Sequence, residues 1–571
     1  MNKAISISKL VTLAILGLAL SACQHTTTNK TETVTAVVDV ASEIANRNIT
    51  VDKMLADIEV LSSDRFGGRA PGTTGGRMTM DFIEEKYRAA GLKPMFGDSY
   101  RQKVSMVSIT AKPESIKASI SQGKQRKALQ YGPEIMLGTS QIVDSVNVMN
   151  SQIIFVGYGI VAPEYEWDDY KDLDVKGKTV MVLINDPGFA TQNPELFNGN
   201  AMTYYGRWSY KYEEAARQGA TGIIIVHETA PAAYPWKVVE SSWSGPQLVL
   251  DSANRNMDRL VFESWVTKDI AEQIINGSGE NFEQLKLAAL SNNFEAIPLN
   301  WKISVHLQNS LEKSSSYNIG GIIPGSSKAD ELFFYTGHWD HLGTDASITD
   351  GSDNIYNGAV DNASGIAALI ALANTFGQLP STPARSVGFL AVTAEESGLL
   401  GSGFYAANPA FALNKTVGGI NMDALTVYGP TEDIVVVGYG SSSLEDQLKI
   451  AAKSQNRLVE PEPTPEKGFF YRSDHFNFAK RGIPVLYAKG GVKHREKGEQ
   501  WMRDISAYHI ANRYHAPGDE INDDWDLRGM VEDVKLFFDI GKHFANSSET
   551  PYWYEGNEFK AIRDASLAEQ Q

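Results

Sequence analysis

The sequence contains one cysteine, Cys23, among 571 residues. A disulfide within the chain is therefore excluded. Positive charge is also scarce: 52 lysines and arginines face 69 acidic residues, for a formal net charge of -17. Nucleic acid and anionic lipid are excluded as the main partners, because binding to phosphates requires basic patches.

Near the N-terminus, the sequence also lacks an apolar run long enough to span a bilayer. The run "LVTLAILGLAL" follows Lys3 and Lys9, a pattern typical of a secretion signal. Its end, "LSAC", resembles the lipobox of bacterial lipoproteins. The resemblance implies cleavage before Cys23, a lipid on Cys23 as the one link to a membrane, and export to the cell envelope. Gln24, which is not an aspartate, implies the outer membrane, facing the periplasm or the exterior. An ordinary signal peptide with a chance cysteine is the alternative.

The rest of the composition, with 42% hydrophobic and 21% charged residues, is typical of a folded protein, and the length predicts at least two domains. Residues 150–290 predict strand, strand, helix and strand in turn, which describes a small α/β module. After Ser315, apolar runs such as "LFFYTG" and "VGFLAV" end in polar clusters. Such runs are typical of strands covered by helices on both faces, and ligands bind beyond the carboxyl ends of these strands.

Acids and imidazoles gather in five segments. They are "GHWDHLG" (337–343), "AVDNASG" (359–365), "TAEESG" (393–398), "INMDA" (420–424) and "NRYHAPGDE" (512–520). Each segment alone is a weak signal, since a pair such as Glu395-Glu396 is usually a solvated surface feature. Together they offer nitrogen and oxygen ligands for a divalent cation such as Zn²⁺, and a carboxylate that can bridge two ions.

In this order, the motifs resemble those of the zinc exopeptidases of the bacterial leucyl aminopeptidase and glutamate carboxypeptidase type, over residues 48–130 and 310–545. The resemblance implies an α/β fold with a mixed, mostly parallel central sheet flanked by helices. It also implies peptide substrates and two divalent metal ions, with Zn²⁺ expected and cobalt or manganese as alternatives. It assigns His338 and Asp423 to one metal, Glu396 and His515 to the other, and Asp361 to the bridge between them.

Three further residues receive roles from the resemblance. Glu395 matches the catalytic carboxylate, which takes a proton from the attacking water and returns it to the leaving amine. Asp340 matches the aspartate that lies behind His338 and fixes its tautomer by a carboxylate hydrogen bond. Tyr471 lies where related enzymes carry a tyrosine that can donate to the oxyanion, with a core aromatic as the alternative.

Spacing alone leaves several residues open. His341 and His509 each lie close in sequence to a proposed ligand, and the family motifs make both of them structural. The resemblance places His475 in the wall of the substrate pocket. Asp519 fits either a neighbour of the metal loop or an exposed turn.

Within residues 150–290, "VKGKTVMVLINDPG" and "AARQGATGIIIVHE" resemble the protease-associated domain, a strand-rich module inserted in secreted exopeptidases. The expected organisation is a signal peptide at 1–22, a lipid-anchored tether at 23–47, a peptidase domain in two parts at 48–140 and 301–550, the inserted module at 141–300, and a C-terminal tail at 551–571.

The sequence therefore predicts a secreted metallo-exopeptidase, with aminopeptidase activity expected first. A carboxypeptidase, a glutaminyl cyclase-like acyl transferase and a non-catalytic binding protein on the same scaffold are the alternatives. A carboxypeptidase needs a cationic pocket for the substrate carboxylate, and four cations are near the right segments: Arg472, Lys489, Lys493 and Arg495. The sequence predicts neither the side-chain preference nor the oligomeric state.

Overall fold

The structure is a computed structural model that describes residues 39–568. The predicted signal peptide, Cys23 and the first part of the predicted tether lie outside the described residues. The last part of the tether differs from the prediction, because Val40–Asn48 forms helix α1. Ile44 and Ala45 of this helix are buried, and Ala45 joins the main hydrophobic core. Burial of these apolar side chains makes the segment part of the fold.

Parallel strands form the centre of the main sheet. In order, they are β17 (Arg385–Val392), β14 (Lys328–His338), β18 (Thr416–Asn421) and β21 (Val485–Gly490). Antiparallel strands flank this centre: β13 (Ile297–Ile323) pairs with β17, and β19 (Asp433–Val436) pairs with β21. The prediction of an α/β fold with a mixed, mostly parallel central sheet is confirmed.

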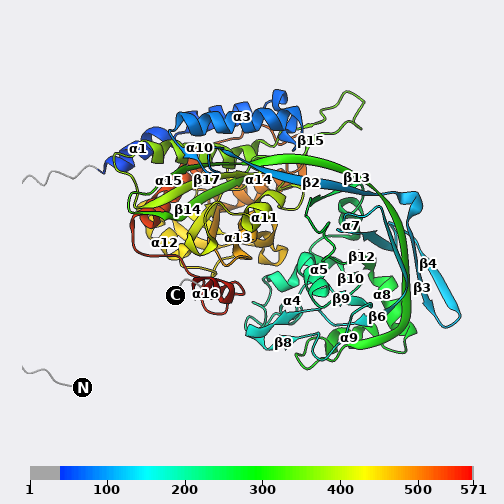
Figure 1. Cartoon of the computed structure of the whole chain (residues 1–571). Coiled ribbons are helices and arrows are strands. Elements are labelled where there is room, and N and C mark those ends of the chain that lie inside the picture. Colours follow the sequence, from blue (N-terminus) through cyan, green and yellow to red (C-terminus); the bar gives the residue numbers. More distant parts are fainter. Residues whose placement is uncertain (1–38, 569–571) are drawn as a thin grey trace, which may run out of the picture. The chain divides into compact units, whose positions relative to one another are not determined.

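Helices cover both faces of this sheet. Side chains along a buried strand point alternately to the two faces, so both faces are apolar and each packs against a layer of helices. In β14, Phe333 and Tyr335 join the core on one face, while Leu332 and Phe334 join a separate cluster on the other. The first layer contains α3 (Thr74–Ala89), α10 (Gly365–Gly377) and α15 (Arg528–Asn546); the second contains α11 (Leu400–Ala407) and α13 (His475–Ala479) (Figure 1).

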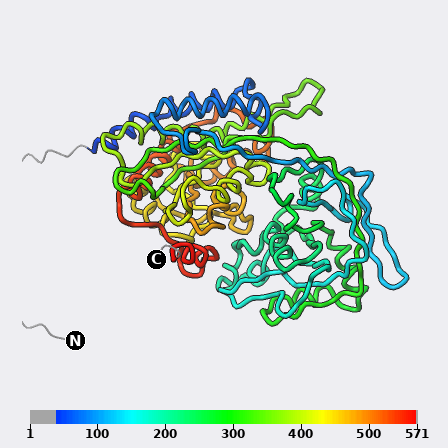
Figure 2. Tube along the Cα trace, in the orientation of Figure 1, coloured from blue at the N-terminus to red at the C-terminus, as the bar shows by residue number. Residues whose placement is uncertain are grey.

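A second sheet contains the segments predicted as a small α/β module. Its parallel strands are β6 (Ser145–Phe155), β9 (Thr179–Leu183), β10 (Gly222–His227) and β12 (Phe262–Thr267). Helix α5 (Trp208–Arg217) lies between β9 and β10 in the sequence, as predicted. Strand β13 belongs to both sheets, since its first half pairs with β6 and its last residues pair with β17. The expected boundary between residues 300 and 301 therefore falls inside one continuous strand, which runs beside β2 (Arg101–Ala111) in Figure 2.

The segment predicted as a C-terminal tail packs into the fold as far as it is described. Trp553 and Phe559 are buried in an aromatic cluster, and helix α16 (Lys560–Ala568) follows them. Arg563 is buried and donates a hydrogen bond to the carbonyl of Thr416 at 3.0 Å. The predicted C-terminal tail is therefore held in the fold by its buried aromatic side chains.

Among the described residues, one helical segment, Ala359–Gly377, is long and apolar enough to cross a membrane. Its most apolar window is 94% buried inside the protein. It is a core helix beneath the central sheet, and it begins at the turn that carries Asp361.

We expect Gly541→Ala to destabilise the protein by roughly 1–3 kcal/mol, because α15 packs closely on β14. A Cβ atom at Gly541 would lie 1.7 Å from the Tyr335 hydroxyl oxygen, which already donates to the carbonyl of Phe537 at 2.9 Å. The matched control is Gly403→Ala in α11, where the nearest atom would lie 3.4 Å away. An alanine there should stabilise the helix by up to about 1 kcal/mol. Chemical denaturation measures the free energy of unfolding of both variants. Changes of the same sign in the two variants would contradict the close contact between α15 and β14.

Candidate metal centre

The predicted ligands follow the carboxyl ends of neighbouring strands. Strand β14 ends at His338, β17 is followed by Glu395 and Glu396, and β18 is followed by Asp423. Parallel strands end at the same edge of a sheet, so the loops after them meet there. The order of the strands thus brings residues far apart in the sequence to one place.

Asp361 lies at the centre of the cluster, in the distorted turn that precedes α10. Its Oδ1 lies 3.2 Å from His338 Nε2, and its Oδ2 lies 3.2 Å from His515 Nε2. His338 Nε2 is also 3.4 Å from Asp423 Oδ1, and His515 Nε2 is 3.1 Å from Glu396 Oε2. All the predicted ligands are therefore brought together, with Asp361 between two pairs.

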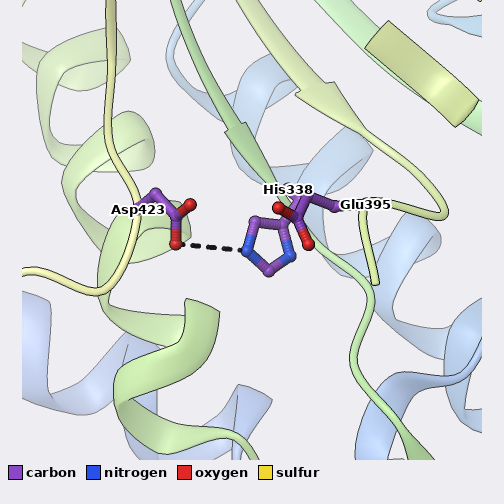
Figure 3. Close-up of side chains that lie close together, drawn as sticks. All are labelled: His338, Glu395 and Asp423. Carbon is purple, nitrogen blue, oxygen red and sulfur yellow. Dashed lines mark hydrogen bonds and ion pairs between the residues drawn. The ribbon is translucent and has the colours of Figure 1, made fainter. Parts of the chain in front are cut away.

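The adjacent glutamates face different partners. Figure 3 shows Glu395 beside His338 and Asp423, and the ligand atoms of these three lie within 4.8 Å of one another. Glu396 instead faces His515. Neighbouring side chains on a turning backbone point to different sides, which allows two adjacent carboxylates to serve different parts of one site.

In its neutral form, His338 has the tautomer that leaves Nε2 without a hydrogen. Its Nδ1 lies 3.1 Å from the main-chain carbonyl oxygen of Asp340, which can only accept, so Nδ1 carries the hydrogen. The expected contact from the Asp340 carboxylate differs: that carboxylate accepts from the Glu395 N–H at 3.1 Å. A lone pair on Nε2 that faces carboxylate oxygens is the donor set that Zn²⁺ prefers, so these residues fit the metal.

The acids around the two imidazoles shift their pKa values. Burial alone lowers the pKa of His338, but the surrounding carboxylates, with Glu395 the largest contributor, raise it well above its usual range. At His515, burial also lowers the pKa, but contacts with Asp361 and Glu396 outweigh it and raise the pKa to about 10. Both imidazoles are drawn towards the cationic form because negative charge is in excess. Divalent cations would satisfy the same requirement.

Arg69 places a buried cation next to these carboxylates. It donates to the main-chain carbonyls of Trp339 at 3.0 Å and Gly358 at 2.7 Å. Burial lowers its pKa to about 10, while Asp519 and Asp361 oppose this effect, so the guanidinium stays charged at neutral pH. Sequence reasoning missed Arg69. The signal that could have found it is a lone arginine in the glycine-rich stretch "FGGRAPG".

Two buried polar side chains hold the turn that carries Asp361. Asp519 accepts from two consecutive backbone N–H groups, including that of Asp361 at 3.0 Å, and is a neighbour of the metal loop rather than an exposed acid. Asn362 donates to the carbonyl of His338 at 3.2 Å and accepts from the N–H of Ala424 at 3.1 Å. The turn is thereby tied to two strand ends at once.

Two side chains that sequence reasoning gave no role at the site touch predicted ligands. His341, assigned as structural, has its Nδ1 2.6 Å from Glu396 Oε1. The Ser473 hydroxyl donates to Asp423 Oδ2 at 2.5 Å. Contacts of this kind orient ligand carboxylates towards a metal.

Other candidate residues have their contacts elsewhere. The Tyr471 hydroxyl donates to Glu558 at 3.0 Å, so it is engaged by the C-terminal segment and does not join the cluster. His475 is fully buried, and burial lowers its pKa to about 3. His509 Nδ1 lies 2.9 Å from the hydroxyl of Tyr428. The prediction of an oxyanion donor at Tyr471 therefore has no support in this geometry.

Comparison with known proteins bears on the same region. Residues 318–538 match the model of Peptidase family M28. This M28 segment contains all the predicted metal ligands and Glu395.

A stretch of 127 residues is 35% identical to Aminopeptidase NAALADL1 of Mus musculus, and covers 21% of this chain and 15% of that protein. The match to the Rattus norvegicus protein of the same name is 32% over 131 residues, and covers 22% and 16%. The chain thus matches about one sixth of the length of these relatives.

Solved structures resemble the chain over more of its length. An aminopeptidase from Aneurinibacillus sp. strain AM-1 is 18% identical, with 89% of this chain and 97% of that chain covered and a TM-score of 0.46. The zinc aminopeptidase BSAP from Bacillus subtilis is 17% identical, with 87% and 96% covered and a TM-score of 0.40.

We expect His341→Gln to weaken binding of a divalent metal by about tenfold to a hundredfold, because Glu396 loses the contact that orients it. The matched control is His509→Gln, whose imidazole contacts Tyr428 instead. Competition with a chromophoric chelator measures the dissociation constants. Equal affinities in the His341 variant and the wild type would contradict a role for His341 in orienting Glu396.

Proposed function

We propose that the protein is a metallo-exopeptidase of the M28 type that removes N-terminal residues from peptides with the help of two Zn²⁺ ions. The observation that carries the proposal is that the two oxygens of Asp361 face different imidazoles, and each imidazole also faces another carboxylate. This arrangement offers three ligands to each of two ions, with one carboxylate shared. The family match and the aminopeptidase relatives support the reaction class.

The pair His338 and Asp423 would hold one ion, and the pair Glu396 and His515 the other, with Asp361 shared. When bound, divalent cations lower the pKa of water from about 15.7 towards about 7 and polarise a carbonyl oxygen. The chain supplies the orientation of the ligands through the contacts described above. It also supplies the group that moves the proton.

Glu395 is that group. Its backbone N–H is fixed by the Asp340 carboxylate, and its side chain lies beside His338. Burial, together with nearby acids such as Glu396, raises the pKa of Glu395 well above its usual range, against the opposing effect of His338. A carboxylate with raised proton affinity accepts a proton from the attacking water and returns it to the leaving amine.

We expect Glu395→Gln to lower kcat by about 10²–10⁴-fold while the metal content stays at the wild-type level, because the amide cannot take the proton. The measurement is mass spectrometry of a tetrapeptide that is free at both ends. Wild-type protein should release the N-terminal residue first, and the exposed control Glu432→Gln should do so at the same rate. A Glu395 variant as fast as wild type would refute the general base. Release of the C-terminal residue would instead support a carboxypeptidase.

We further propose that a lipid on Cys23 anchors the protein to the outer membrane and that residues 141–300 form an inserted protease-associated module. The motif "LSAC" and the two segments quoted above support these proposals. We expect Cys23→Ser to move the protein from the membrane fraction to the aqueous fraction, because no other acylation site of this kind is available in a chain with one cysteine. Fractionation and intact mass test this, and a membrane-bound Cys23→Ser variant would contradict it.

A further inference from the structure

Part of the second sheet is covered on one face only. Hydrophobic clusters lie on both sides of β9 and β10, but β3 (Lys117–Gln122), β4 (Gln125–Leu129) and the first half of β13 contribute to one of these clusters alone. In β13, every second side chain packs on the same side as α8 (Lys268–Gly277) (Figure 1): Trp301, Ile303, Val305 and Leu307. The side chains between them, such as Lys302 and His306, therefore point to the other face, where they are exposed or half-buried.

This uncovered face is basic, although acidic residues outnumber lysines and arginines by 69 to 52 in the chain. We call it the basic face, and its side chains are Lys117, Ser119, Ser121, Arg126, Lys302, Ser304 and His306. No acidic residue occurs in any of the strand segments that form this part of the sheet, which are residues 117–122, 125–129, 145–155 and 297–308. Lys127, next to Arg126, lies 3.0 Å from Glu134, but the three cations of the basic face are exposed and have no ion pair with any residue that the structure describes.

The register of the strands fixes the spacing of these three cations. Arg126 and Lys302 pair with Ser121 from opposite sides, so their Cα atoms are two strand spacings, or about 10 Å, apart. Lys117 pairs with His306, which is four residues, or about 13 Å, along β13 from Lys302. The positive charges are therefore distributed over the face instead of being gathered at one point. This distribution fits a surface with many anionic groups better than a single small anion.

Protection of a sheet edge explains only part of this pattern. Edge strands often carry lysine or arginine, which prevents them from pairing with another chain. That explanation applies to Arg126, because β4 pairs with β3 alone among the described strands. It does not apply to Lys302, which pairs with β3 on one side and with β6 on the other. A cation in the middle of the sheet, on a face without acids, indicates a role in binding.

We propose that the basic face binds the anionic head groups of a membrane surface. Lysine and arginine near such a surface are attracted by its negative potential, and the serine hydroxyls between them donate hydrogen bonds to phosphates. The net charge excludes anionic lipid as the main partner of the chain, so the basic face is a local exception that gives the protein one favourable orientation. A lipid on Cys23, as proposed above, would hold the chain near a membrane, and the basic face would turn one side of the protein towards it.

The test measures binding to vesicles by co-sedimentation. It uses the protein without its signal peptide and with Cys23→Ser, so that no lipid anchor contributes. This protein should bind vesicles of phosphatidylethanolamine and phosphatidylglycerol, should bind vesicles of phosphatidylcholine much more weakly, and should be released as the salt concentration rises. The additional changes Lys117→Gln, Arg126→Gln and Lys302→Gln together should weaken binding to the anionic vesicles by roughly a hundredfold, because each cation contributes about fivefold.

The matched control removes three exposed cations from other parts of the surface. Lys453→Gln, Lys467→Gln and Arg481→Gln change the net charge by the same amount, and this variant should bind the anionic vesicles as the parent protein does. Lys302→Gln alone should weaken binding about fivefold, which tests the proposal even if the triple variant of the basic face is unstable.

Equal affinities of the two triple variants would overturn the proposal, because net charge alone would then determine binding. Equal binding of the parent protein to anionic and neutral vesicles, or binding to neither, would overturn it as well. If polyglutamate or single-stranded DNA binds the basic face while the anionic vesicles do not, the partner is an acidic polymer and the membrane is excluded. Because Cys23 is replaced throughout, each of these results leaves the proposed lipid anchor to its own fractionation test.

Discussion

The structure depends on how it holds several carboxylates in one buried place. Two unit charges 4 Å apart interact by about 4 kcal/mol at an effective dielectric constant of 20, so unbalanced acids would drive the strand ends apart. The chain offsets this repulsion with imidazoles on both sides of Asp361 and with the buried guanidinium of Arg69. The remaining excess of negative charge favours bound cations. The excess of buried carboxylates therefore destabilises the metal-free fold and, for the same reason, favours the binding of cations.

The sheet makes this concentration of charge possible. Each strand enters the site through a fully buried apolar run, and burial of β14, β17 and β18 fixes where the following residues lie. The backbone groups beyond the strand ends need partners, and Asn362 supplies them for two strand ends at once. Its amide is fully buried, so it makes these bonds in a region of low dielectric, where they are strongest. The hydrogen bonds that Asn362 makes to main-chain groups thus also fix the positions of the acidic side chains.

The central sheet and the residues that approach Asp361 could be predicted because both leave local signals: continuous apolar runs, each followed by a motif. Arg69 left only the glycine-rich stretch around it as a signal, because its partners are main-chain carbonyls such as that of Trp339, 270 positions away, and any residue type offers a carbonyl. The Asp340 contact differs for the same reason, since the oxygen that meets His338 belongs to the backbone. The position of Tyr471 could not be predicted, because its hydroxyl donates a hydrogen bond to Glu558. Glu558 lies in the segment that the sequence predicts as a C-terminal tail.

An exopeptidase must recognise one end of its substrate, and charge can provide that recognition. In the proposed function, acidic side chains near the metal centre would attract the ammonium group of a peptide, and the net charge of -17 would repel its carboxylate. A peptide with opposite charges at its two ends would then have one favourable orientation at the metal centre. The direction in which a substrate binds would follow from this asymmetry of charge.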